Sequence, residues 1–267
     1  MSVAVSNRRQ TGELAKIVAR RIGDLIRPLA DTSMPVPKSE WTVGETAAHL
    51  AFAKDLMARM VAGEALTYSD GTREGLAAAN MESLGGLTER NGAVLAGMIE
   101  SGVDAFFRTA DLLPSGSRRN SPLGPLPVDV YSSYVLAHLM MHGEPMSRAL
   151  RKKPVMDRES VLAAMPFVIF AMERFVDSNA VQNLTAAFAL HVRGGQTYYI
   201  TFDKGQPRFT SEKVRRVDCH VSADPVALLK VGFRIIEQWG PIATFKLTTW
   251  GPKPWLAFRF AGLFLPP

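Results

Sequence analysis

Apolar residues recur with the period of an α-helix through the first 150 residues of the chain. The pattern predicts helical regions at residues 11–30, 42–62, 74–112 and 129–150. We expect the third to be interrupted near residue 85, where two glycines adjoin. The second begins at a capping box, because Glu45 follows Thr42 three residues later, and Trp41 just before it is a candidate hydrophobic staple. Prolines and glycines make 114–127 a predicted loop, so the four helices favour a bundle.

After a further helical segment at 158–178, alternation with a period of two replaces the helical pattern. The alternating apolar positions are Phe188, Leu190 and Val192, then Tyr198, Ile200 and Phe202. Gly194-Gly195 between them is typical of a hairpin turn. The remaining expected elements are a strand at 217–221, a helix beginning at Asp224-Pro225, a strand at 243–249 and a helix at 254–263.

The change of period predicts an α+β protein of two domains. We place a helical bundle at residues 1–157 and an α+β domain at residues 158–267. The length of 267 residues suits two domains, and a hydrophobic content of 47% supplies enough apolar surface for two cores.

The net charge of +6 is not gathered into long basic runs, so we expect no nucleic-acid partner. No apolar stretch is long enough for a membrane span, and the N-terminus lacks an apolar signal core. The single cysteine, Cys219, fits a reducing compartment and is expected to be a packed small residue. The expected location is therefore cytoplasmic. The sequence leaves the oligomeric state open.

Three of the five histidines lie in the predicted bundle. His138 and His142 are four residues apart, which places both imidazoles on one face of a helix. Both share that face with apolar residues. On its own helix, His49 shares a face with Thr46, Ala53, Leu56 and Met60. The three imidazoles are therefore expected to point into one core. The remaining two, His191 and His220, are expected at the surface of strands.

Two interpretations fit three inward histidines. Each can be a core residue satisfied by hydrogen bonds, or together they can hold one metal ion. Few polar partners share their helix faces, and unsatisfied buried nitrogens are costly, so we favour a metal bound by His49, His138 and His142. Imidazole ligands suit zinc, copper, iron and nickel, and three nitrogens with an open fourth position describe a catalytic zinc site.

The sequence around these histidines resembles a known family. Residues 41–50 (WTVGETAAHL) are similar to the first metal-ligand helix of mycothiol-dependent maleylpyruvate isomerases and their DinB-like relatives. The segment 138–143 (HLMMHG), followed by Arg148, is similar to the second. Residues from about 160 onward resemble a sterol-carrier-protein-type domain, chiefly through 247–258 (LTTWGPKPWLAF).

The resemblance implies a DinB-like four-helix bundle that binds zinc or another divalent metal, followed by a sterol-carrier-like domain. It implies a thiol cosubstrate, mycothiol, for isomerisation or thiol transfer to a small electrophile. The chain departs from the isomerases at His138, where they commonly carry glutamate, and at Glu144-Pro145, after the second ligand. These departures weaken the case for the maleylpyruvate reaction itself.

Other residues have weaker claims on function. Tyr134, one turn before His138, can line the metal site or pack in the core. Arginines can pair with a carboxylated substrate, and the candidates are Arg90, Arg108, Arg148 and Arg208. A C-terminal aromatic cluster can line a lipid tunnel, although a packed core is the favoured interpretation; it comprises Trp239, Trp250, Trp255, Phe258, Phe260 and Phe264. The alternative function is therefore a non-catalytic carrier of sterol, acyl or other apolar ligands, with a structural or vestigial metal.

Overall fold

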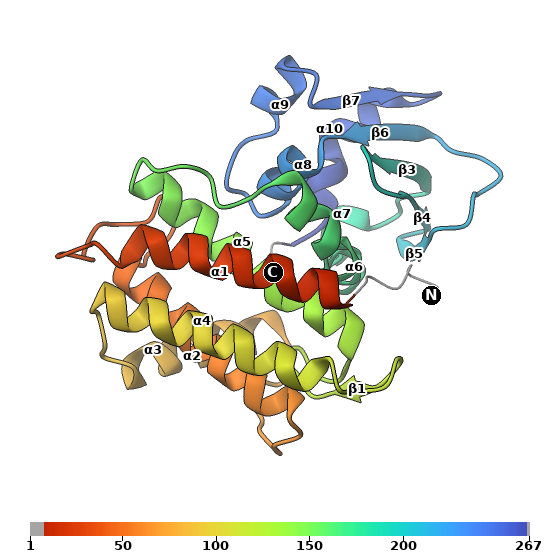
Figure 1. The fold of residues 1–267 in the computed structure, drawn as a ribbon. Coiled ribbons are helices and arrows are strands. Elements are labelled where there is room, and N and C mark those ends of the chain that lie inside the picture. The colour runs from red at the N-terminus through yellow and green to blue at the C-terminus, as the bar shows by residue number, and fades with distance from the viewer. Residues whose placement is uncertain (1–7, 266–267) are drawn as a thin grey trace. The chain divides into compact units, whose positions relative to one another are not determined.

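A computed structural model describes residues 8–265 of the chain (Figure 1). Contacts divide these residues into two compact units, 8–167 and 168–265. The division falls within helix α6 (Arg158–Arg174), later than the predicted boundary at residues 157 and 158. Among the described helices, none combines the length and the apolar character that a membrane crossing requires.

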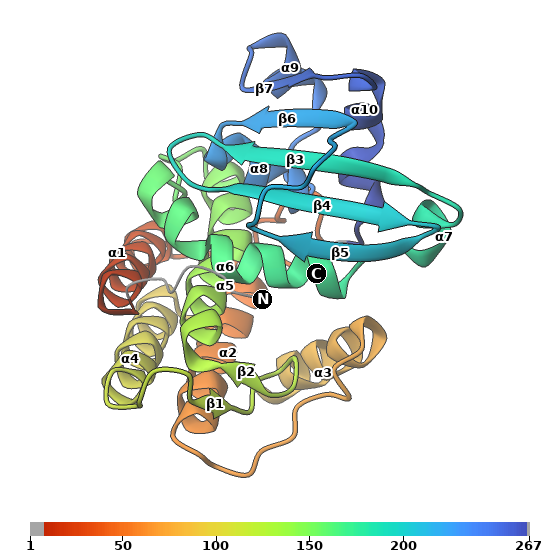
Figure 2. The same ribbon diagram turned by 90° about the vertical axis from the view of Figure 1, so that its right-hand side faces the viewer.

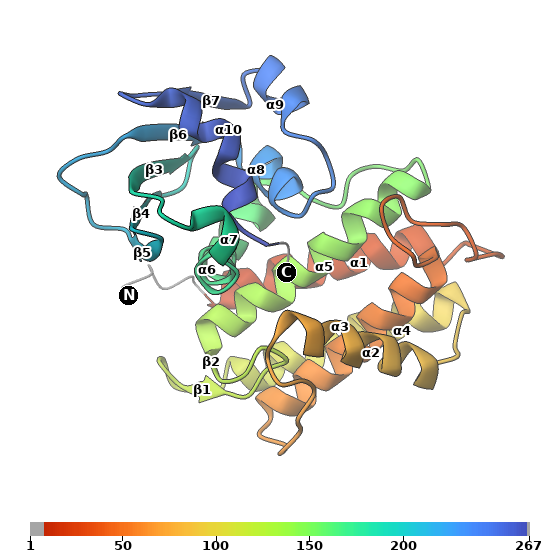
Figure 3. The same ribbon diagram turned by 180° about the vertical axis from the view of Figure 1, so that it is seen from behind.

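The first unit is helical, and its elements lie close to the predicted ranges: α1 (Arg8–Ile26), α2 (Val43–Val61), α3 (Arg73–Gly86), α4 (Gly92–Ala110) and α5 (Val128–Ala149). The four long helices pack as the sequence predicted, with α1 and α2 each contacting both α4 and α5. The shorter α3 packs on α2 (Figure 3). Aromatic rings fill the centre of this unit, where Phe106 meets Phe107 and Tyr131 edge to face.

Two connecting segments of the helical unit were predicted from the sequence, the break near residue 85 and the loop at 114–127. The predicted interruption is real, because α3 ends at Gly86 and α4 starts only after Asn91, whose side chain accepts from the backbone of Ala93 and Val94. The segment 114–127 is mostly loop. Within it, however, two short antiparallel strands pair, β1 (Arg118–Arg119) and β2 (Leu126–Pro127), which the prediction of a loop did not include.

The second unit is built on one five-stranded sheet in the order β5-β4-β3-β6-β7 (Figure 2). Its strands are β3 (Ala186–Val192), β4 (Thr197–Asp203), β5 (Gln206–Thr210), β6 (Cys219–Ala223) and β7 (Leu247–Trp250). β3 pairs with β6 in parallel, and the other pairs are antiparallel. The accompanying helices are α7 (Ser178–Val181), α8 (Pro225–Gly232), α9 (Trp239–Ala243), α10 (Ala257–Phe260) and the short 3-10 turns η1 (Pro254–Leu256) and η2 (Ala261–Leu263).

The predicted hairpin is confirmed, since all six alternating apolar residues of β3 and β4 are buried. Two details of the sheet were predicted wrongly. The edge strand β5 was missed because it is polar and contains Pro207, which an edge position tolerates. The strand expected at 243–249 begins only at Leu247, because α9 occupies the segment up to Ala243 and Phe245 takes a positive φ of 55°.

Candidate metal centre

The capping box of α2 sets the position of His49. The backbone N–H of Glu45 donates to Thr42 Oγ1, and Glu45 Oε2 accepts in return from the backbone N–H of Thr42. Both bonds satisfy groups that a helix start leaves unpaired, so the helix begins at a defined residue. His49 follows about two turns later and is only 2% exposed.

α5 supplies the other two histidines one turn apart. The ring centroids of His138 and His142 are separated by 4.7 Å, and each ring lies within 5.1 Å of the ring of His49. His138 is 5% exposed, whereas His142 is partly buried. The structure therefore brings together the three histidines that the sequence singled out.

The spacing of the nitrogens fits one metal ion. Nε2 of His49 and Nε2 of His138 lie 3.2 Å apart, and one nitrogen from each of the three rings lies within 4.8 Å of the others. A tetrahedral zinc with Zn–N bonds of about 2.0–2.1 Å sets its ligand nitrogens roughly 3.3 Å apart. Without a metal, the 3.2 Å contact is a hydrogen bond between neutral imidazoles, and Nδ1 of His49 stays buried without a partner among the described residues. Protein hydrogen bonds alone thus leave the cluster incompletely satisfied.

Burial keeps these imidazoles neutral. Desolvation, and then the charges of His142 and Lys54, hold the pKa of His49 well below 6.5. Desolvation likewise lowers the pKa of His138 far below its ordinary value and that of His142 to about 3. Neutral rings have free lone pairs at neutral pH, which is the form that binds a metal. Since the cluster has no carboxylate, a bound divalent cation would keep its full charge.

Lys54 is a member of the site that the sequence analysis missed. Its Nζ lies 3.1 Å from Nδ1 of His138 and 3.5 Å from the sulfur of Met57. The side chain is fully buried, and desolvation lowers the pKa of its amine well below 10.5. A sequence signal existed, because Lys54 falls in the buried apolar stripe that contains Leu50 and Val61.

Two aromatic residues border the histidines. Trp41, which the sequence suggested as a staple, stacks on His142 with a centroid distance of 6.1 Å and lies 5.0 Å from His49. Tyr134 meets His138 edge to face at 5.8 Å and stacks on Phe167 at 4.3 Å, so it both packs in the core and borders the site. Neither ring adds charge, so both help to keep the site apolar.

The candidate arginines do not converge on one place. Arg90 donates to the backbone carbonyls of Leu87 and Glu89. Arg108, Arg148 and Arg208 are exposed. Nothing in these positions selects one of them as a substrate ligand.

The other two histidines lie on the sheet and alternate with buried neighbours, as expected of surface positions on strands, but the sequence did not predict that they contact each other. His191 and His220 are half-buried, with Nε2 of His191 2.9 Å from Nδ1 of His220. Trp250 stacks on both rings at 5.1–5.2 Å. Cys219 is fully buried, as predicted, and burial raises the pKa of its thiol.

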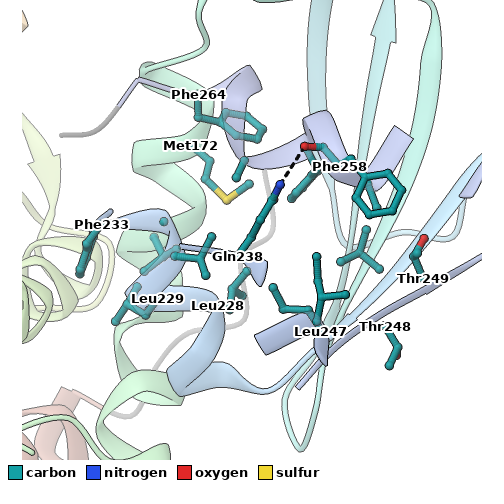
Figure 4. Close-up of a pocket in the computed structure, with 18 of the residues that line it drawn as sticks. Met172, Leu228, Leu229, Phe233, Gln238, Leu247, Thr248, Thr249, Phe258 and Phe264 are labelled. Atoms are coloured by element: carbon teal, nitrogen blue, oxygen red, sulfur yellow. Dashed lines mark hydrogen bonds between the residues drawn. The ribbon is translucent and has the colours of Figure 1, made fainter. Parts of the chain in front are cut away.

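The second unit contains an apolar cavity of about 360 Å³ (Figure 4). Its wall comes from α6, α8, β7 and the C-terminal segment, including Met172, Leu228, Leu229, Leu247, Phe258 and Phe264. The side chain of Gln238 lies among these residues and donates to the carbonyl of Phe258. The favoured expectation of a packed aromatic core was wrong for the tryptophans, which are 47–60% exposed. Three of the phenylalanines, Phe258, Phe260 and Phe264, line the cavity instead.

Comparisons with known proteins were made by sequence and by structure. No protein-family model matches the chain, and the curated proteins contain no match. Two of the structural matches are mycothiol-dependent maleylpyruvate isomerases. One, a mutant form, is 11% identical over 92% of this chain and 95% of that chain, with a TM-score of 0.50. The other is 13% identical over 84% and 88%, with a TM-score of 0.47.

A third structural match is a ubiquinone synthesis protein, UbiJ-SCP2. It is 20% identical over 37% of this chain and 94% of that chain, with a TM-score of 0.31. At these identities a likeness concerns the fold alone. Over nearly its whole length, therefore, the chain is similar in fold to a mycothiol-dependent maleylpyruvate isomerase.

Proposed function

We propose that this chain binds a divalent transition metal, zinc foremost, through His49, His138 and His142. The metal would serve a reaction of a small-molecule thiol, either transfer of the thiol to a small electrophilic substrate or thiol-dependent isomerisation of that substrate. The observation that carries the proposal is the convergence of three neutral, desolvated imidazoles within 4.8 Å of one another. Such a donor set suits zinc, nickel, copper or iron better than magnesium or calcium. Mycothiol is the proposed thiol, because a protein of similar fold is a mycothiol-dependent isomerase.

The chemistry follows from ligand count and charge. His49, His138 and His142 would hold the ion through nitrogen atoms alone, and a divalent cation held there would lower the pKa of a small-molecule thiol and so supply a thiolate nucleophile. The imidazoles add no negative charge to the site, which would favour an anionic ligand. Trp41 and Tyr134 border the cluster with aromatic rings, and such apolar surroundings would disfavour water as a competing hydrolytic nucleophile.

Calorimetric titration tests this function. Zinc-loaded protein should bind mycothiol with release of a proton, and a thiol-blocked analogue should bind far more weakly. Glutathione distinguishes a general thiol site from one selective for mycothiol. The His142→Ala protein should lose both the binding and the proton release. Absence of binding for every free thiol at millimolar concentration would contradict the proposed function.

The apolar cavity of the second unit supports a second candidate, carriage of an acyl chain, sterol or other apolar ligand. A volume of about 360 Å³ lies within the range of small-molecule sites, and the wall is mostly aliphatic and aromatic. Binding of a fluorescent fatty acid by metal-free protein, with unchanged affinity after zinc is added, would favour this candidate. Turnover of a thiol with an electrophile would favour the first.

A further inference from the structure

Exposed aromatic rings gather in one stretch of the second unit. Among the described residues, the exposed tryptophans and phenylalanines all lie between positions 239 and 258: Trp239, Phe245, Trp250, Trp255 and Phe258. Each of them exposes between 47% and 76% of its surface. Large apolar rings are unfavourable in water, so a gathering of this kind points to a surface that a partner covers.

Three of these rings lie at the mouth of the apolar cavity. Phe245 and Phe258 line the cavity and are also exposed, which places both at its opening. The ring of Trp239 lies beside that of Phe258, with centroids 6.0 Å apart. The preceding residue, Gln238, donates to the carbonyl of Phe258 inside the cavity (Figure 4). Trp239, Phe245 and Phe258 form what we call the mouth patch, and through it the apolar surface of the cavity continues outward.

The backbone of Phe245 is strained although its side chain gains little burial. Its φ is 55°, a left-handed conformation that is costly for a bulky residue. Two hydrogen bonds hold it there. The guanidinium of Arg193 donates to the carbonyl of Phe245 at 2.9 Å, and the N–H of Phe245 donates to the carbonyl of Ile242 at 3.1 Å. With 76% of the residue exposed, packing within the fold does not account for this arrangement, and such strain is typical of functional positions.

Positive charge accompanies the mouth patch. Residues 225–267 contain five lysines and arginines and one glutamate, which is a net charge of +4 within a chain total of +6. Lys246 follows Phe245, Arg259 follows Phe258, and both cationic residues are exposed. Two copies of this face would repel each other, whereas an anionic surface would attract it. Aromatic rings beside cations are the usual combination at the interface between a membrane and water.

We propose that the mouth patch docks on the surface of an anionic lipid membrane. Trp239, Phe245 and Phe258 enter the interfacial layer, and the cavity opens toward the acyl chains. Lys246 and Arg259 contact the anionic headgroups. Docking requires neither the metal nor a bound ligand, so it goes beyond both proposed functions. Only the use of docking to load the cavity rests on the proposed carriage of an apolar ligand.

Sedimentation with vesicles tests the charged part of the surface. The wild type should bind phosphatidylcholine vesicles that contain about a third phosphatidylglycerol, and binding should weaken with added salt or without the anionic lipid. The double variant Lys246→Glu/Arg259→Glu should bind at least about 20-fold more weakly, because each cation near an anionic surface strengthens binding roughly fivefold. Lys152→Glu/Lys153→Glu is the matched control. It changes the net charge equally at exposed positions of the other unit and should bind as the wild type does.

Phe245→Gly separates docking from a structural role. Glycine takes a φ of 55° without strain, so the melting temperature of this variant should equal or exceed that of the wild type. Its binding to the anionic vesicles should nevertheless fall at least about fivefold, because the inserted ring is lost. Brominated acyl chains should quench the tryptophan emission of the vesicle-bound wild type, and should quench that of Trp239→Phe less.

Several results would overturn the proposal. Absence of binding to the anionic vesicles would do so, as would equal binding to vesicles of phosphatidylcholine alone or unchanged binding by Phe245→Gly. Sedimentation velocity without lipid tests the other occupant, since a dimer that Phe245→Gly dissociates would show that a second copy covers the patch. Docking by a wild type that binds no fluorescent fatty acid would support the patch and remove only the carrier function.

Discussion

Nε2 of His49 lies 3.2 Å from Nε2 of His138, although the two residues are 89 positions apart in the chain and belong to different helices. With both rings neutral, one Nε2 must carry a proton and donate a hydrogen bond to the other for this contact to be favourable. A metal ion between them would take the place of that proton and would also bind His142. The contact is therefore the geometric basis of the proposed metal centre.

Metal-free protein should lose stability on acidification. Burial holds the pKa of His142 at about 3, and those of His49 and His138 well below 6.5, whereas all three titrate near 6.5 in the unfolded chain. Between these values the unfolded state binds more protons, so stability is complete above about pH 6.5 and falls as the pH drops toward 3. Each histidine contributes a slope of up to about 1.4 kcal/mol per pH unit.

Urea denaturation between pH 7 and pH 4 measures this slope. His142→Gln should show a shallower dependence, because one buried titrating group is removed while the size of the side chain is nearly kept. Identical slopes in this variant and the wild type would mean that His142 does not carry the effect.

Trp41 should report metal binding by fluorescence. It is the one tryptophan in residues 8–167, and its ring stacks on His142. A first equivalent of Ni²⁺, an open-shell ion, should quench this emission because of its proximity. The quenching should disappear in Trp41→Phe and persist in Trp250→Phe. Full quenching in the Trp41→Phe protein would place the ion elsewhere.

The candidate site could be predicted from the sequence where local geometry decided it. A separation of four residues on one helix brings His138 and His142 together regardless of the rest of the fold. The prediction of His49 required only that its face of the helix point into the core. Lys54 was missed since a lysine is normally taken as exposed, although its place in an apolar stripe marked it. The contact between Trp41 and His142 depends on how α2 and α5 pack, which periodicity does not report.

The fold, too, could be predicted where the local sequence pattern decides the structure, and not where distant parts of the chain do. Periods of 3.6 and of two predicted the main helices and the β3–β4 hairpin, because burial of one face imposes them. The weak elements depended on their neighbours instead. β5 is polar and exists because β4 offers a free edge, and the last strand starts late because α9 ends in a turn at Phe245. Pairing between strands distant in sequence leaves little local trace.

Filling the cavity should abolish carriage without affecting the metal. Leu228 lies on α8 and lines the cavity wall (Figure 4). In Leu228→Trp we expect at least a tenfold loss of affinity for a fluorescent fatty acid, because the larger ring occupies the space of the ligand. Zinc affinity should not change. His142→Ala is the matched control, in which zinc affinity should fall and fatty-acid affinity should not change. Fatty-acid binding unaffected by Leu228→Trp would argue against this cavity as the carrier site.

The prediction of separate domains at residues 1–157 and 158–267 can be tested by limited proteolysis. Arg151, Lys152 and Lys153 are exposed in the segment between α5 and α6. Trypsin should cut there before it cuts within 131–150, where the backbone is helical and mostly buried. A first cut inside α5 would contradict the predicted boundary.

The most direct test of the metal centre is the zinc affinity of the wild type beside three single variants, His49→Ala, His138→Ala and His142→Ala, measured by competition with a chelator. The metal centre predicts about one zinc per chain in the wild type. It also predicts loss of most of that metal in each variant, because two imidazoles hold zinc far more weakly than three. His191→Ala, which removes a histidine of the other unit, should bind zinc as the wild type does. Full zinc retention in both His142→Ala and His49→Ala would contradict the three-histidine site.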